Sequence, residues 1–197
     1  MIRKLPLIPT LVVAAAVAVM IVLGFWQIRR AHEKEALLAR YRTAQSLPPI
    51  TFPTSPIHSD QLPLFRNATG LCLKVIAMRT AAGSNRAGEP GFAQIADCVT
   101  GAEGPGMSVE LGWSKNPNAA VNWRGGLVSG IIAPDRKTRM RLVAASAPPG
   151  LEPSAPPSIG QIPNNHRAYA VQWFLFALIA AVIYVLAVRK RLQEPKP

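Results

Sequence analysis

Two long apolar runs lie near the two ends of the chain. The first extends from Leu5 to Ile28, and the second, from Ala168 to Val188, contains no charged residue. Each is close to the roughly 20 residues that a helix needs to cross a lipid bilayer. The pattern therefore predicts two transmembrane helices, at about 5–28 and about 168–188.

Between these runs, apolar and polar residues alternate over short segments that are separated by Gly, Pro and Asn. Such alternation is typical of half-buried strands, and short strands at turn spacing indicate a small antiparallel sheet or a partly closed barrel. The fold class that we predict is membrane α+β, with two transmembrane helices flanking a small antiparallel β domain. The expected strands cover 71–79, 92–99, 107–113, 121–132 and 138–144.

Two proline-rich segments separate the alternating region from the helices. Proline disrupts helices and central strands, so we interpret both segments as extended linkers. The predicted organisation is an N-terminal helix with an amphipathic extension (1–45), a linker (46–63), a β domain (64–146), a second linker (147–165) and a C-terminal helix with a basic tail (166–197).

The formal net charge is +12, and basic residues cluster beside the two apolar runs. Anionic lipid headgroups attract cations at such positions, so we expect membrane lipid, and not nucleic acid, as the partner of these charges. Cleavage of the first run as a signal peptide would leave an apolar N-terminus, which favours an uncleaved anchor. The basic stop at 189–191 favours cytoplasmic termini and a periplasmic domain.

The short stretch before the first run lacks the composition of a mitochondrial transit peptide, which is rich in Arg and Ser. We therefore expect the protein in a bacterial cytoplasmic (inner) membrane, as a multi-pass protein.

The two cysteines, Cys72 and Cys98, lie in two strands that we predict to form a hairpin. A domain outside the cytoplasm permits a disulfide between them. Unpaired buried thiols and metal or redox chemistry are the alternatives, although the chain has no Cys-x-x-Cys motif.

Local signatures of catalysis are missing from the sequence. It has three histidines, no Gly-x-Ser-x-Gly or Gly-x-Gly-x-x-Gly motif, and its acidic residues are scattered among turns and strand edges. An enzyme usually shows a nucleophile with a base, a carboxylate pair or a metal cluster. We therefore do not expect an enzyme, and an anchored extracytoplasmic sensor or hydrolase is kept as an alternative.

Distinctive residues stand where the two apolar runs meet the central region. The first run ends in Leu23-Gly24-Phe25-Trp26-Gln27-Ile28-Arg29-Arg30, and the second begins with Asn164-Asn165-His166-Arg167-Ala168-Tyr169-Ala170-Val171-Gln172-Trp173-Phe174. At helical spacing, His166, Tyr169 and Trp173 share one face. Tyr and Trp are also common at membrane interfaces, so this face has a purely structural interpretation as well.

Taken together, the two segments resemble the surfeit locus family of cytochrome c oxidase assembly factors. In that family an L-G-x-W-Q-x-x-R element closes the first span, an N-x-H-x-x-Y-A-x-x-W-F element opens the last, and a mainly β domain lies between them. The turn that we expect at Gly112-Trp113 resembles the R-G-W segment of the family, with Leu111 in place of the arginine.

The resemblance implies an assembly factor that holds or delivers haem a to the catalytic subunit of the oxidase. The expected partners are that subunit and the machinery that makes haem a. A neutral histidine can ligate haem iron, aromatic rings can flank the macrocycle, and arginines can pair with its propionates. The expected site comprises His166, as the tentative iron ligand, with Tyr169, Trp173, Trp26, Gln27, Arg30 and Arg167. A scaffold that binds oxidase subunits without haem is the alternative.

Overall fold

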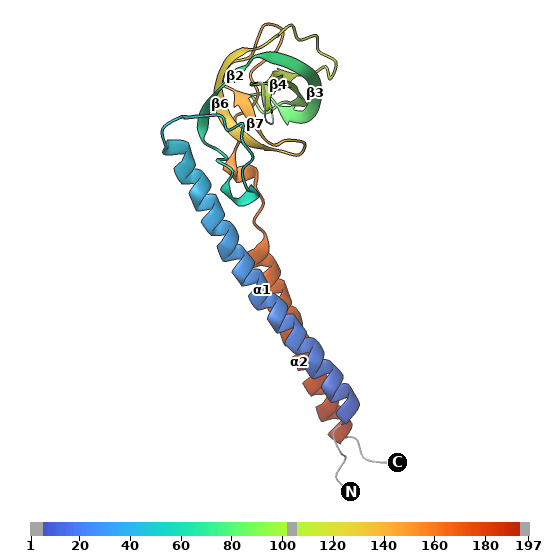
Figure 1. Cartoon of the computed structure of the whole chain (residues 1–197). Coiled ribbons are helices and arrows are strands. Elements are labelled where there is room, and N and C mark those ends of the chain that lie inside the picture. Colours follow the sequence, from blue (N-terminus) through green and yellow to red (C-terminus); the bar gives the residue numbers. More distant parts are fainter. Residues whose placement is uncertain (1–5, 102–105, 194–197) are drawn as a thin grey trace. The chain divides into compact units, whose positions relative to one another are not determined.

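A computed structural model describes residues 6–101 and 106–193 of the chain (Figure 1). The chain divides into two compact units, which are described separately below. One unit contains the first helix up to Leu37 together with the C-terminal helix, and the other contains Leu38–Ile162. The predicted start of the first span at residue 5 and the last residues of the basic tail lie outside the described residues.

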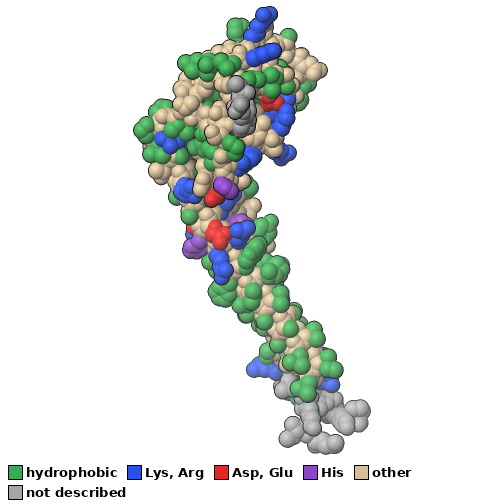
Figure 2. Space-filling view, in the orientation of Figure 1, with side chains coloured by type: hydrophobic (Ala, Val, Ile, Leu, Met, Phe, Trp, Pro, Cys, Tyr) green, Lys and Arg blue, Asp and Glu red, His purple; other side chains and the backbone are tan. Residues whose placement is uncertain are grey.

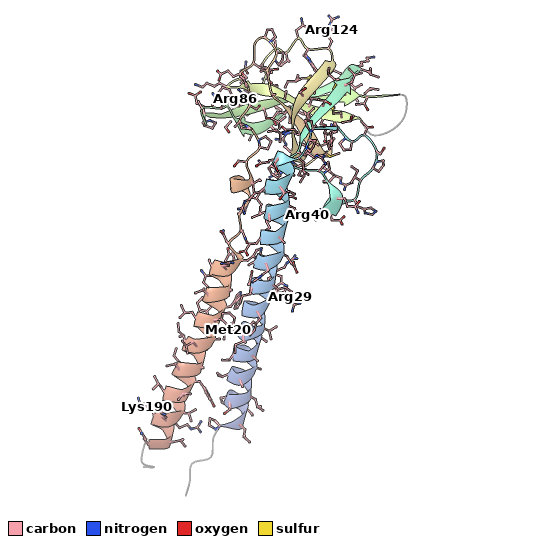
Figure 3. All side chains as sticks on the ribbon, turned by 90° about the vertical axis from the view of Figure 1, so that its left-hand side faces the viewer. Met20, Arg29, Arg40, Arg86, Arg124 and Lys190 are labelled. Atoms are coloured by element: carbon pink, nitrogen blue, oxygen red, sulfur yellow. A yellow bond between two sulfur atoms is a disulfide. The ribbon has the colours of Figure 1, made fainter. Side chains whose placement is uncertain are left out.

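The first unit is a pair of long helices: α1 (Leu7–Ser46) up to Leu37, and α2 (His166–Gln193). By length and composition, both are able to cross a membrane. They run antiparallel and side by side, and Lys190 lies near the C-terminal end of α2 (Figure 3). Hydrophobic side chains cover most of the pair's visible surface between charged groups at either end (Figure 2). The prediction of two apolar helices at the two ends of the chain is confirmed.

The second unit contains a seven-stranded, mostly antiparallel sheet in the order β1-β2-β6-β7-β5-β4-β3, which confirms the predicted fold class. Only the β1–β2 and β5–β7 pairs are parallel within the described residues. The strands are β1 (Ile50–Thr51), β2 (Asn67–Cys72), β3 (Lys74–Ser84), β4 (Pro90–Val99), β5 (Met107–Ser114), β6 (Gly126–Asp135) and β7 (Arg139–Ala144). Two 3₁₀ turns, η1 (Ser59–Gln61) and η2 (Ile159–Gln161), complete the unit.

The strand predicted at 71–79 is two strands in the structure. Cys72 ends β2 opposite Gly126 of β6, whereas Leu73 donates its N–H to Val99 O and so starts the pairing with β4. One residue thus separates two strands that lie far apart in the strand order, which requires a strongly curled sheet. The strand predicted at 121–132 likewise begins only at Gly126, which follows Gly125, and both glycines have a φ of 134°. Such φ values strain residues with a side chain.

The two proline-rich segments were interpreted as extended linkers, and this is wrong for parts of both. In the first segment, β1 pairs with β2 and Phe52 is buried in the core. In the second, Glu152 exchanges backbone hydrogen bonds with Trp113, and Ser154 is buried. The residues between prolines keep their N–H groups, so short stretches of them can pair with an exposed strand.

Cys72 and Cys98 form a disulfide with a Cα–Cα distance of 5.3 Å. Both cysteines are buried within the apolar core of the domain, which also includes Phe52, Phe65, Met107, Val109, Leu111, Ile132 and Leu142. The bond links the end of β2 to β4. It therefore fixes the sheet next to Leu73, where the chain passes from β2, near one edge of the sheet, to β3 at the other edge.

Loss of this disulfide is expected to lower the free energy of unfolding of the β domain by about 3 kcal/mol. The bond closes a loop with a sequence separation of 26 residues, which restricts the unfolded chain. Denaturant unfolding of the Cys72→Ala/Cys98→Ala variant in detergent, followed by circular dichroism, measures the change. A reductant should produce a similar loss in the parent and none in the variant. An unchanged parent midpoint under reductant would contradict the expectation.

Ion pairs hold the curled sheet together across its strands. Asp135, at the end of β6, accepts hydrogen bonds from Arg79 of β3 at 2.9 Å and from Arg141 of β7 at 3.3 Å. Arg79 also contacts Asp97 of β4, and Arg141 contacts Glu110 of β5. Burial raises the pKa of Asp135, but hydrogen bonds from the Thr138 backbone and hydroxyl and from Arg79 outweigh this and lower the pKa to about 2.

The domain is therefore expected to lose stability in acid. The folded-state pKa of Asp135 lies below its ordinary value of 3.8. Its contribution is thus present above about pH 4 and is lost as the pH falls through about 2; after allowance for solvent screening, the loss is about 1–2 kcal/mol. Unfolding midpoints measured between pH 6 and pH 2 should fall less steeply for Asp135→Asn than for the parent. If the unfolding midpoints of the parent and of Asp135→Asn fell equally with pH, Asp135 would not be the source of the acid sensitivity.

Candidate functional site

Small residues line the seam between the two helices. Gly24 and Ala31 on α1 and Ala170 and Ala177 on α2 are buried, whereas most large apolar side chains of both helices are exposed. Small residues let membrane helices approach closely, which maximises van der Waals contact where no hydrophobic effect drives pairing. At Gly24 the approach is so close that a methyl group would lie 2.6 Å from Cε1 of Phe174.

Polar contacts join the two helices at two levels along this seam. At one end, Nδ1 of His166 lies 2.7 Å from Oε1 of Gln27. At the other, the hydroxyls of Thr10 and Tyr184 are 2.5 Å apart, and Thr10 also donates to the carbonyl of Pro6. In a bilayer such groups have few other partners, so these contacts favour one register of α1 against α2.

His166 is the first residue of α2 and is half-buried. Its contact with Gln27 engages one ring nitrogen. The other, Nε2, has no hydrogen-bond partner within residues 6–101 and 106–193. A neutral imidazole with one free nitrogen is a suitable metal ligand.

Aromatic side chains surround this end of the helix pair. Trp26 on α1 and Tyr169 on α2 are 47% and 49% exposed, so their rings are available to a ligand or to lipid. Phe25 and Phe174 meet edge to face across the seam, with ring centroids 5.3 Å apart. Trp173 is half-buried and packs against Phe176 on its own helix.

Several arginines lie within three positions of Gln27 or His166 in the sequence. Arg30 pairs with Glu33 at 2.7 Å and lies over the Trp26 ring. Arg167 of α2 pairs with Glu35 of α1 through two contacts: Nε lies 2.8 Å from Oε1, and Nη2 donates to Oε2 at 3.1 Å. Arg29, labelled on α1 in Figure 3, has no ion-pair partner among the residues that the structure describes.

Comparison with known families accounts for this arrangement. Residues 14–178, which include both helix ends and the whole sheet, match the model of the SURF1 family. The chain belongs to the SURF1 family. This family is known for the assembly of cytochrome c oxidase. No individual curated protein matches the chain.

The structure brings together some of the residues that the sequence predicted for the SURF1 site. Gln27 and His166, 139 positions apart, are in direct contact. Trp26 precedes Gln27, Tyr169 follows His166 by three positions, and both are exposed, whereas Arg30 and Arg167 are each engaged with a carboxylate. Trp173 lies one turn further along α2, and its ring contacts Phe176.

Other features of this SURF1-family protein were not found from the sequence. The Thr10–Tyr184 contact is one, because a single hydroxyl in an apolar run gives no signal of its partner. Phe174 was seen only as part of a motif, and its packing against Gly24 depends on the helix register. For Gly112-Trp113 the sequence predicts both the end of a strand over 107–113 and a turn; the structure confirms the strand, because both residues lie inside β5, with Trp113 buried.

Replacing Gly24 with a larger residue is expected to weaken the helix pair. Gly24→Leu forces Phe174 or the backbone to move, and overpacking of this kind typically costs about 1–3 kcal/mol. Unfolding in detergent mixtures, followed by circular dichroism, measures the change. Ala15→Leu, at an exposed position of the same helix, is the matched control. Equal stabilities for the two variants would contradict a close seam at Gly24.

Proposed function

We propose that the helix pair of this SURF1-family protein holds haem a at its His166 end and delivers it to the catalytic subunit of the oxidase. The observation that carries the proposal is that Nε2 of His166 has no hydrogen-bond partner among the described residues, on one of two helices that each can cross a membrane by length and composition. Haem would supply an iron that an imidazole nitrogen can ligate. His166 is the residue proposed for that position.

The surroundings of His166 fit an amphiphilic macrocycle. The Trp26 and Tyr169 rings are large, apolar over their faces and about half exposed. Aromatic faces offer extensive contact area to a flat apolar ring. The exposed apolar side chains of α1 and α2 continue this surface, so a bound haem would exchange lipid contacts for protein contacts.

Cations fit the two propionates of the haem. Arg29 has no ion-pair partner in the described part of the chain, but it projects from the side of α1 away from α2 (Figure 3). Arg30 and Arg167 are paired, but their side chains are 54% and 72% exposed. Exposed ion pairs are worth only about 0–1 kcal/mol, so a propionate can compete with Glu33 or Glu35 for these arginines.

We further infer that the termini of this protein are cytoplasmic and its β domain periplasmic in a bacterial inner membrane. The basic residues 189–191 after the second span support this orientation. The buried disulfide between Cys72 and Cys98 supports an oxidising compartment for the domain. In that location the protein would meet the oxidase catalytic subunit and the enzymes that make haem a within one membrane.

A hydrolase or sensor site in the β domain has less support. A cavity of about 300 Å³ in this unit is lined by Glu110 and Arg141, among other residues. These two side chains pair with each other at 2.6 Å. The Glu110 carboxylate is thus engaged in the ion-pair network of the sheet, a structural role.

The absorption spectrum of the protein purified from cells that make haem a tests the proposal. A haem band is expected in the parent and in His58→Ala, which changes a loop histidine outside the helix pair. His166→Ala should lose the band or shift it, because the iron loses a ligand. Equal yield and equal circular dichroism would show that the variants fold alike.

Two results would count against the proposal. Absence of haem from the parent would leave a scaffold that binds oxidase subunits through its helices. A haem band that is unchanged in His166→Ala would keep the cofactor and remove His166 from the iron.

A further inference from the structure

The Gln27–His166 contact suggests a specific role for Gln27 that rests on the proposed haem site. We infer that Gln27 is a positioning residue: it holds His166 in the tautomer with the proton on Nδ1, directs Nε2 to the iron, and tunes the ligand strength of the imidazole. The sequence predicts Gln27 as a residue of the haem site. In the structure its side-chain oxygen lies 2.7 Å from Nδ1 of His166.

The tautomer follows from the identity of the two atoms in contact. Oε1 of Gln27 is a carbonyl oxygen, which accepts hydrogen bonds and has no proton to donate. We therefore infer that Nδ1 of His166, 2.7 Å from it, carries the proton and donates it. In a neutral imidazole the lone pair then lies on Nε2, which is the nitrogen without a partner among the described residues.

The orientation of the ring depends on both helices. His166 begins α2, so little of its own helix holds the ring from the N-terminal side. Gln27 reaches it from α1, between the close approach at Gly24 and the buried Ala31. The adjacent Arg167 is tied to Glu35 of α1 at 2.8 Å, which fixes the first turn of α2 against the same helix.

A hydrogen bond at Nδ1 also changes the imidazole as a ligand. An acceptor at the N–H of a ligating histidine raises the basicity of the other nitrogen, and a carboxylate acceptor does so more strongly than an amide. The chain offers an ordered series at this position: Gln27→Leu removes the acceptor, the parent has a neutral one, and Gln27→Glu has an anionic one. A residue that only packs the helices would not produce a graded electronic effect.

The first experiment needs no haem. Nitrogen-15 NMR of the full-length haem-free protein in detergent micelles reports which nitrogen of each histidine carries the proton. The chain has three histidines, so His166 is assigned by its loss in His166→Ala. We expect the Nδ1–H tautomer in the parent and in the matched control Gln172→Leu, an exposed glutamine on α2. Gln27→Leu should lose this preference. An Nε2–H tautomer in the parent would overturn the inference.

The second experiment uses the haem-loaded protein. The reduction potential of the haem should fall in Gln27→Glu and rise in Gln27→Leu relative to the parent and Gln172→Leu. The iron–imidazole stretching frequency in the resonance Raman spectrum of the ferrous protein should rise in Gln27→Glu and fall in Gln27→Leu. Equal potentials and frequencies in all four proteins would overturn the tuning role.

The two experiments separate the inference from the function on which it rests. If the parent binds no haem but shows the Nδ1–H tautomer that Gln27→Leu loses, the proposed function fails and the positioning of His166 by Gln27 stands. If haem is lost in His166→Ala but the series at position 27 leaves tautomer, potential and frequency unchanged, the haem site stands and the role of Gln27 fails.

Discussion

The close approach of α1 and α2 is the constraint on which the rest of the helix unit depends. Gly24 leaves no room for a methyl group beside the Phe174 ring, and Ala31, Ala170 and Ala177 keep the seam narrow. A hydrogen bond between side chains of two helices forms only when the backbones lie this near. The small residues along the seam thus bring the helices close enough for the Gln27–His166 and Thr10–Tyr184 contacts.

This geometry separates two groups of residues within the SURF1 motifs. One group faces the seam and sets the register, as Gly24 does by its lack of a side chain. The other group, Trp26 and Tyr169, lies within three positions of Gln27 and His166 in the sequence, is exposed and is available to a ligand. Residues adjacent in the motif thus serve different purposes, because successive positions on a helix point in different directions.

The β domain depends on a different kind of interaction. Its first long strands, β2 and β3, are nearly continuous in sequence but belong to opposite parts of the strand order. The disulfide and the Asp135 bridge between Arg79 and Arg141 both span this curl. The buried charges are compensated by partners from several strands, which specifies the arrangement of those strands because an unpaired buried charge is costly.

The sequence by itself determined the features that depend on local pattern: two apolar helices at the ends, a β region between them, the β3–β4 hairpin and the SURF1 motifs at the helix ends. Each is visible in residues close together in the chain, since periodicity and run length reflect burial and bilayer thickness. Tertiary structure alone decided where one strand becomes two at Leu73, and how proline-rich residues such as Phe52 enter the core. It also decided that Gln27 contacts an imidazole, because that contact joins residues 139 positions apart and depends on the register of two helices.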